Sequence, residues 1–272
     1  MKSRNYAAFI SAITLFALLS FPMGTNASHS WGNYHWARTS NPFTIRVVDS
    51  NTPDWDGELG LAKSDWSQST FLNMISGASD DTSRIRKRCT MVSGQVRSCN
   101  ASYGFNGWLG LASINISGSH ITQGSSKMND SYFSDTVRYN DTARRHVMCQ
   151  ELCHTLGLGH QDESGADLGT CMDYANALDN PSPNQHDYDQ LASIYTHTDS
   201  TTTVGFTAFS ANRFGDDPDA PHNWGRLVSQ SANGRSSFYE LDLGRGNKIA
   251  RHVFWTQEAA DRCHGCDHRY DH

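Results

Sequence analysis

The sequence predicts a mixed α/β (α+β) domain followed by a small β-rich extension. Strand-like alternation and helix-like segments are interspersed before about residue 200, and after it short strands and turns dominate. The chain has 272 residues, 37% of them apolar, which suits one compact domain and an appendage better than two full enzyme domains. The formal net charge of −6, without a basic stripe, speaks against nucleic-acid binding.

Residues 1–27 are typical of an export signal. Lys2 and Arg4 precede the mostly apolar segment 7–21, and cleavage is expected after Ala27. The apolar segment is short for a membrane span and contains hydroxyl side chains. We therefore expect a secreted protein, extracellular or periplasmic, without a membrane anchor after cleavage, beginning with a leader at 28–42.

The main domain is expected at 43–200, and its elements follow from local pattern. Residues 108–116 carry the strongest strand signal, and Asp141-Thr142 is a candidate cap for a helix at 143–156. The other expected elements are a strand at 43–48, a helix at 59–71, a strand from Ile85 into a hairpin between Cys89 and Cys99, a strand at 121–128, and a helix opened by Ser182-Pro183 and running through Tyr195. In the extension, 201–272, residues 224–255 predict a β-meander.

Residues 150–160, with the sequence Q-E-L-C-H-T-L-G-L-G-H, predict a metal site. Side chains at Gln150 and His154 share one helix face and can converge on one ion. Glu151 lies beside that face, where it can take a proton from metal-bound water. Gly157 permits a positive φ that ends the helix, so that His160 returns as a third ligand. Three protein ligands plus water is the pattern of a catalytic zinc.

This segment resembles the metzincin motif H-E-x-x-H-x-x-G-x-x-H, with Gln150 at the first histidine position. A second element agrees: Met172 lies 12 residues after His160 and matches the methionine-containing turn that metzincins place beneath the zinc. Tyr174 occupies the position of a tyrosine found in astacin-like and serralysin-like metzincins. The resemblance, over about residues 43–198, implies a twisted mixed sheet, an active-site helix and a Met-turn. It also implies Glu151 and Tyr174 as catalytic residues.

Gln150 is the departure from this pattern, and three interpretations remain. Its amide oxygen replaces imidazole as a Zn²⁺ ligand, as Q-E-x-x-H members of the gametolysin-like metzincins suggest; this is the interpretation we favour. Alternatively, another residue substitutes, although His146 lies too far along the helix and Cys153 points away from the ligand face. In the third interpretation the site is degenerate, but Glu151 is not needed as a ligand and argues against a decayed site.

Seven cysteines in an exported chain predict disulfides. A bond between Cys149 and Cys171 would tie the active-site helix to the Met-turn and leave Cys153 as the odd thiol. The other expected pairs are Cys89–Cys99 and Cys263–Cys266. The C-terminal cysteines with His264, His268 and His272 are an alternative second metal site, which we consider less favoured than a small disulfide.

The sequence therefore predicts a secreted, monomeric, zinc-dependent metalloendopeptidase acting on protein or peptide substrates. One zinc would be bound by Gln150, His154 and His160, with Glu151 as general base. The alternative from another class is a catalytically inactive metzincin-like protein that binds peptides. A peptidase using a different metal is a third possibility.

Overall fold

The computed structural model describes residues 29–162, 164–205, 219–263 and 265–270. The predicted signal lies outside these residues, as do His264 and His272. Within the described ranges, no helix is both long and apolar enough to cross a membrane.

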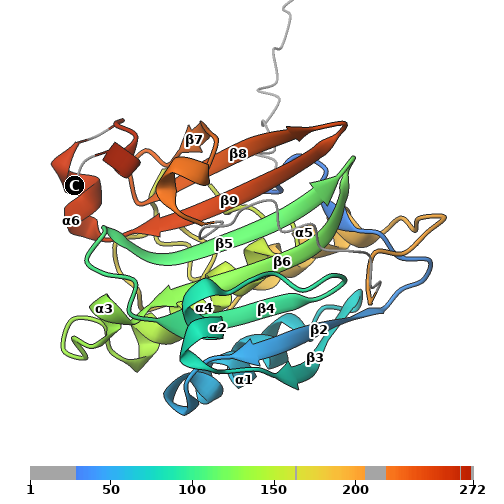
Figure 1. Ribbon diagram of the computed structural model, residues 1–272, viewed down its shortest axis with the longest axis horizontal. Helices are drawn as coiled ribbons and strands as arrows, with labels where there is room; N and C mark the ends of the chain where they lie inside the picture. The colour runs from blue at the N-terminus through green and yellow to red at the C-terminus, as the bar shows by residue number, and fades with distance from the viewer. Residues whose placement is uncertain (1–28, 163, 206–218, 264, 271–272) are drawn as a thin grey trace, which may run out of the picture.

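In the described part of the chain, nine strands form one twisted mixed sheet (Figure 1). The order across it is β3-β2-β4-β6-β5-β9-β8-β7, with β1 pairing the start of β6. The pairs among β1, β2, β3, β4 and β6 are parallel, whereas those involving β5, β7, β8 and β9 are antiparallel. The strands are β1 (His35–Trp36), β2 (Phe43–Ser50), β3 (Leu72–Ser79), β4 (Val96–Ala101), β5 (Trp108–Ser117), β6 (His120–Asn129), β7 (Arg226–Gln230), β8 (Ser236–Gly244) and β9 (Asn247–Trp255).

The helices pack around this sheet, and α4 is the one that carries the motif. It contacts β5 and β6 on one side and α1 on the other. The indole of Trp66, at the end of α1, donates to the carbonyl of Cys149 in α4 at 3.0 Å. The helices are α1 (Asp56–Trp66), α2 (Ser83–Arg88), α3 (Asp130–Phe133), α4 (Asp141–His154), α5 (Gln185–Tyr195) and α6 (Gln257–Arg262), with short 3-10 turns at Pro53–Trp55, Pro221–Asn223 and His268–Tyr270.

The C-terminal meander continues the main sheet. Strand β9 pairs antiparallel with β5 along its whole length, and the register places His252 opposite Ala112. Both strands are almost fully buried, because each has packed layers on its two faces. The segment from 201 onward therefore contributes side chains to the interior of the main domain.

The expected strand beginning at Ile85 is wrong, because residues 83–88 form the helix α2. The side chain of Thr82 accepts the N–H of Ile85 and caps this helix, and Arg84, Lys87 and Arg88 face solvent. The strand in this region is instead β3, at 72–79. Cys89 and Cys99 are bonded as expected, but their disulfide joins the end of α2 to β4 and does not close a hairpin.

The predicted helix boundaries shift by a few residues. The helix expected at 59–71 runs from 56 to 66, and α4 is capped by Asn140, whose side chain accepts the N–H of Ala143. The cap predicted at Ser182-Pro183 is wrong. Asn184 caps α5 in a reciprocal capping box with Asp187. The side chain of Asn184 accepts the backbone N–H of Asp187, and the side chain of Asp187 accepts the backbone N–H of Asn184.

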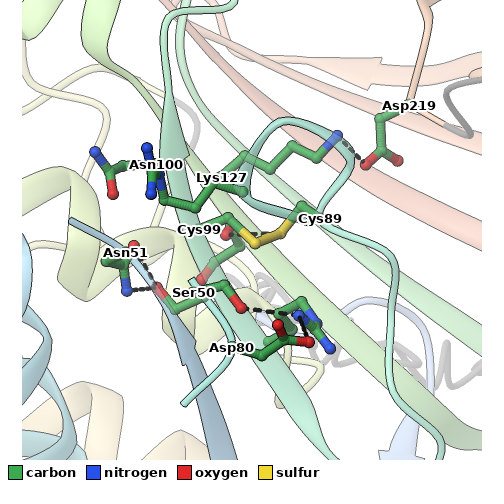
Figure 2. Close-up of a disulfide and its surroundings, with 12 residues drawn as sticks. Ser50, Asn51, Asp80, Cys89, Cys99, Asn100, Lys127 and Asp219 are labelled. Atoms are coloured by element: carbon green, nitrogen blue, oxygen red, sulfur yellow. Dashed lines mark hydrogen bonds and ion pairs between the residues drawn. A yellow bond between two sulfur atoms is a disulfide. The ribbon is translucent and has the colours of Figure 1, made fainter. Parts of the chain in front are cut away.

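A buried charge cluster holds the start of the C-terminal segment against the sheet. Asp219 lies 2.8 Å from the ammonium of Lys127 in β6 and 3.1 Å from the guanidinium of Arg251 in β9. Figure 2 shows Lys127 reaching across the Cys89–Cys99 disulfide to this carboxylate. Burial alone would raise the pKa of Asp219, but the two cations lower it to about 2, so the carboxylate is ionised.

We expect Asp219→Asn to destabilise the fold by about 3–5 kcal/mol, because two buried cations lose their common counter-charge. Denaturant unfolding followed by circular dichroism measures the change. Asp242→Asn, the same exchange at an exposed position in β8, is the matched control and should cost less than about 0.5 kcal/mol. Equal stability of the two variants would contradict a stabilising role for the cluster.

Candidate metal centre

Helix α4 carries several polar side chains that are buried in the interior of the protein, away from water. His146, Gln150, Glu151 and His154 are all fully inaccessible, between the sheet and α1. Burying such groups costs several kcal/mol unless partners compensate. Their positions in the interior therefore indicate a site, and the contacts of each side chain show what it can do.

Three histidines converge at the end of this helix. His154 and His160 approach each other with 2.8 Å between their Nε2 atoms, and the ring of His252 from β9 lies 3.9 Å from that of His154, centroid to centroid. One nitrogen from each ring lies within 4.8 Å of the other two. We call these residues the three-histidine cluster. The backbone places His160: after α4 the chain turns at Gly157, whose φ is 85° and whose Cβ would collide with the carbonyl oxygen of Tyr34.

The environment favours neutral imidazoles in the three-histidine cluster. Burial and then the neighbouring His252 lower the pKa of His154 well below its usual value. Burial and then His154 do the same for His160, and burial lowers the pKa of His252 to about 3. The Nδ1 of His154 lies 2.8 Å from the carbonyl oxygen of Leu158, so that an N–H there donates and Nε2 keeps its lone pair for the cluster. Neutral imidazole is the form that ligates metals.

Glu151 lies against the cluster, as the motif predicts. Its Oε2 is 3.1 Å from Nδ1 of His252, and a backbone hydrogen bond from Ala112 in β5 helps to hold the carboxyl group. Burial raises the pKa of Glu151 well above its usual value. Gly110 leaves the space for this side chain, because a Cβ there would lie 2.7 Å from both Cγ and Oε1 of Glu151.

We expect Gly110→Ala to displace Glu151, since its methyl group would also lie 2.7 Å from Val147. Overpacking of this kind costs about 1–3 kcal/mol of stability. Gly60→Ala is the matched control: it lies in α1, where a Cβ meets nothing within 4 Å, and it should stabilise by about 0.5–1 kcal/mol. Urea unfolding of both variants measures the difference; a Gly110→Ala protein as stable as Gly60→Ala would show that Glu151 is not confined.

Gln150 points toward the Met-turn. Its Nε2 donates to the carbonyl of Cys171 at 2.9 Å and, more weakly, to that of Asp173 at 3.4 Å. The Cys149–Cys171 disulfide joins the same helix to the same turn, as expected from the sequence. Buried Met172 lies in this turn, and its carbonyl accepts the N–H of Gln161, next to His160. The helix and the Met-turn therefore form one unit around Gln150.

Aromatic rings cover the cluster. Tyr174 stacks on His160 with ring centroids 3.9 Å apart, and Trp31 from the leader stacks on His154 at 5.0 Å. A cleft of about 130 Å³ opens beside them. Its lining includes Trp31, Gly159, His160, Tyr174, Ser231, Ser236, Phe238 and His252. The cleft is thus bounded by the leader, the Met-turn and the C-terminal meander, and its wall includes two of the three histidines.

Two other candidates lie apart from the cluster. His146 turns its Nδ1 to the carbonyl of Asn180, at 2.9 Å, and does not belong to the group of converging ligand atoms. Cys153 is buried and is the one described cysteine outside a disulfide. Cys263 and Cys266 are bonded to each other, so they are not available as thiolate ligands at the tail.

The three-histidine cluster fits a divalent cation. Three imidazoles with a vacant direction form the ligand set of a catalytic zinc, and nitrogen ligands suit Zn²⁺. Unpartnered polar atoms surround it: among the described residues, Oε1 of Gln150, Oε1 of Glu151 and Nδ1 of His160 are buried without a hydrogen-bond partner. Gln150 Oε1 therefore stays a predicted ligand, and His252 supplies a third imidazole that the sequence analysis did not include.

His252 was missed because nothing local marks it. It is a single histidine within a mostly buried strand, more than ninety residues after His160, and strand histidines commonly pack in cores. The pairing of β9 with β5 brings it to α4. Trp31 was missed for the same reason, since the leader reaches the site through the contact of its backbone N–H with the carbonyl of Gly157.

No family model matches the chain, and no curated protein matches it by sequence. Solved structures similar to it include archaemetzincin from Archaeoglobus fulgidus, with 11% identity, 54% of this chain and 99% of that chain covered, and a TM-score of 0.32. Archaemetzincin from Methanopyrus kandleri has 14% identity, coverage of 61% and 98%, and a TM-score of 0.36. Myroilysin has 13% identity, coverage of 58% and 82%, and a TM-score of 0.36. Since these scores are low, the metzincin resemblance rests on the mixed sheet, helix α4, the Met-turn and the histidines themselves.

Proposed function

We propose that this chain is a secreted zinc-dependent metalloendopeptidase that acts on protein or peptide substrates. The observation that carries the proposal is the position of Glu151, buried beside three converging histidines at the edge of a cleft. In a structural metal site such a carboxyl group would only orient a ligand histidine. A peptidase needs one to move the proton between water and the leaving amine.

His154, His160 and His252 would hold the zinc, which when bound supplies a Lewis acid and lowers the pKa of a coordinated water. Glu151 accepts a proton from the attacking water and delivers it to the departing amine. Its Oε2 also accepts an N–H from Nδ1 of His252, which sets the orientation of that ring. Tyr174 lines the cleft, where its hydroxyl would contact the substrate carbonyl. Gln150 joins α4 to the Met-turn and is the alternative third ligand.

The alternative function is a non-catalytic protein that uses the cleft to bind peptides. The observation that favours it is the position of Trp31, which stacks on His154 and covers part of the cluster. In that case the chain would bind zinc and peptides without cleaving them.

Purified mature protein, assayed on casein and on a library of quenched fluorescent peptides, tests the proposal. Expected are hydrolysis, loss of hydrolysis in a chelator, and recovery when Zn²⁺ is added back. Stoichiometric zinc with peptide binding but no cleavage would support the binding protein. A preparation that takes up no metal would contradict both functions.

A further inference from the structure

A second cluster of potential metal ligands lies away from α4. Ligand atoms of His35 in β1, His120 at the first position of β6, and Asp199 after α5 lie within 4.8 Å of one another. His197, also after α5, lies beside His35. Strands β1 and β6 are parallel with His35 opposite His120, so the two side chains are neighbours across the pair. Asp199 lies in the loop after α5, and its backbone N–H donates to the carbonyl of Arg38. We call these four residues the second ligand cluster.

The distances within the second ligand cluster are those of a coordination shell. Nε2 of His35 and Nε2 of His120 each lie 3.3 Å from Oδ1 of Asp199. Nε2 of His197 lies 3.8 Å from the same oxygen and 3.2 Å from Nε2 of His35. Tetrahedral zinc with bonds of about 2.0–2.1 Å separates its ligand atoms by about 3.3 Å. The three separations from Asp199 Oδ1 and the one between His35 and His197 lie around that value.

The ring orientations agree with a common centre. The ring of His35 is nearly perpendicular to the ring of His120, at 80°, and to the ring of His197, at 86°. In each pair the contact is edge to face, and the centroids are 5.0 Å and 4.6 Å apart. The rings therefore do not stack, and the Nε2 atoms of His35 and His197 lie 3.2 Å apart.

The hydrogen bonds leave lone pairs facing each other at this point. Nδ1 of His35 lies 2.7 Å from the carbonyl oxygen of Asn33, so an N–H there donates, and in the neutral imidazole Nε2 then carries a lone pair on the side of Asp199. Oδ2 of Asp199 accepts from the backbone N–H and the guanidinium of Arg38, at 3.1 and 3.0 Å, which directs Oδ1 to the histidines. Hydrogen-bond acceptors that face each other repel, whereas a cation bound between them interacts favourably with the lone pairs of each.

We propose that His35, His120, His197 and Asp199 bind a second, structural Zn²⁺. Three imidazoles and one carboxylate are a ligand set that zinc accepts, and four protein ligands leave no open position for a reacting water. The side chain of His197 is 48% exposed and that of His120 34% exposed, so an ion can enter from solvent. This site does not depend on the proposed peptidase function.

The consequence of the second site concerns the leader. Residues 35–38 contact the end of α5 through Arg38, whose guanidinium donates to the carbonyls of Tyr195 and His197. The same leader continues back to Trp31 over His154. Zinc bound by the second ligand cluster joins the leader, β6 and the segment after α5, and thereby holds Trp31 at the cleft.

The test is the zinc content of purified protein by plasma emission spectroscopy, with thermal unfolding as a second measurement. Wild type should bind two zinc ions per chain. His120→Gln should bind one and unfold at a lower temperature, and the wild-type Tm should fall toward that of the variant in a weak chelator. His222→Ala, at an exposed histidine outside both clusters, is the matched control and should keep both ions.

The two sites are distinguished by their own variants. His160→Ala should lose one ion, and combined with His120→Gln it should lose both, whereas Co²⁺ bound to the His160→Ala protein should show the visible absorption of a tetrahedral site. The proposal is overturned if wild type binds a single ion that disappears with His160→Ala and persists in His120→Gln. Wild-type protein that binds both ions but hydrolyses no peptide would count against the proposed function alone and leave the second site standing.

Discussion

Glu151→Gln is expected to lower kcat/KM for peptide hydrolysis by about 10²–10⁴-fold, the usual contribution of a positioned general acid–base group. The amide keeps the shape of the buried side chain and can still accept the N–H of His252, but it cannot take a proton from water. Zinc content and Tm should therefore stay close to those of wild type. Steady-state assays on a quenched peptide, together with metal analysis of the same preparation, measure both quantities.

Glu258→Gln is the matched control for this change, because it makes the same exchange at an exposed position of α6. It should hydrolyse peptides at the wild-type rate. Unchanged kcat/KM in Glu151→Gln would contradict its role as the base. A protein that loses zinc along with activity would show instead that Glu151 acts mainly by orienting His252.

His252→Ala is expected to bind one zinc ion fewer than wild type and to lose peptide hydrolysis. Removing a metal ligand should cost more than the roughly 10–100-fold in affinity that is typically lost when a hydrogen-bond partner of a ligand is removed. His146→Ala is the matched control: this histidine is equally buried, but it bonds to Asn180 outside the three-histidine cluster. The His146→Ala protein should keep its zinc. Zinc titration with a competing chromophoric chelator, after circular dichroism has shown that each variant is folded, measures the affinities.

Gln150→Ala distinguishes the two candidates for the third ligand. If His252 is the ligand, Gln150→Ala loses only its hydrogen bond to the Met-turn carbonyl of Cys171 and retains zinc. If the amide oxygen of Gln150 is the ligand, the outcomes reverse, and His252→Ala keeps the ion. Loss of zinc in both variants would indicate that the site needs all four side chains.

Local sequence was sufficient for the parts of the site that lie on one helix and its turn. The spacing of Glu151, His154 and His160 depends on helix pitch and on one positive-φ glycine, both local properties. The bond between Cys149 and Cys171 joins this helix to the Met-turn, 22 residues away in sequence, as expected. The strands predicted at 108–116 and 121–128 are confirmed as β5 and β6, and the first of them has a strong apolar signal of its own.

Tertiary structure decided the rest. The helix at 83–88 is the exception, because its cap from Thr82 is a local signal that lies in the sequence. His252 reaches the cluster only because β9 pairs with β5, and His35 reaches His120 only because β1 pairs with β6. Strand pairing between distant segments depends on the packing of whole faces, which leaves no mark at a single histidine. The sequence by itself therefore determined the helix motif and its chemistry, whereas the fold decided which distant side chains complete the two metal-ligand clusters.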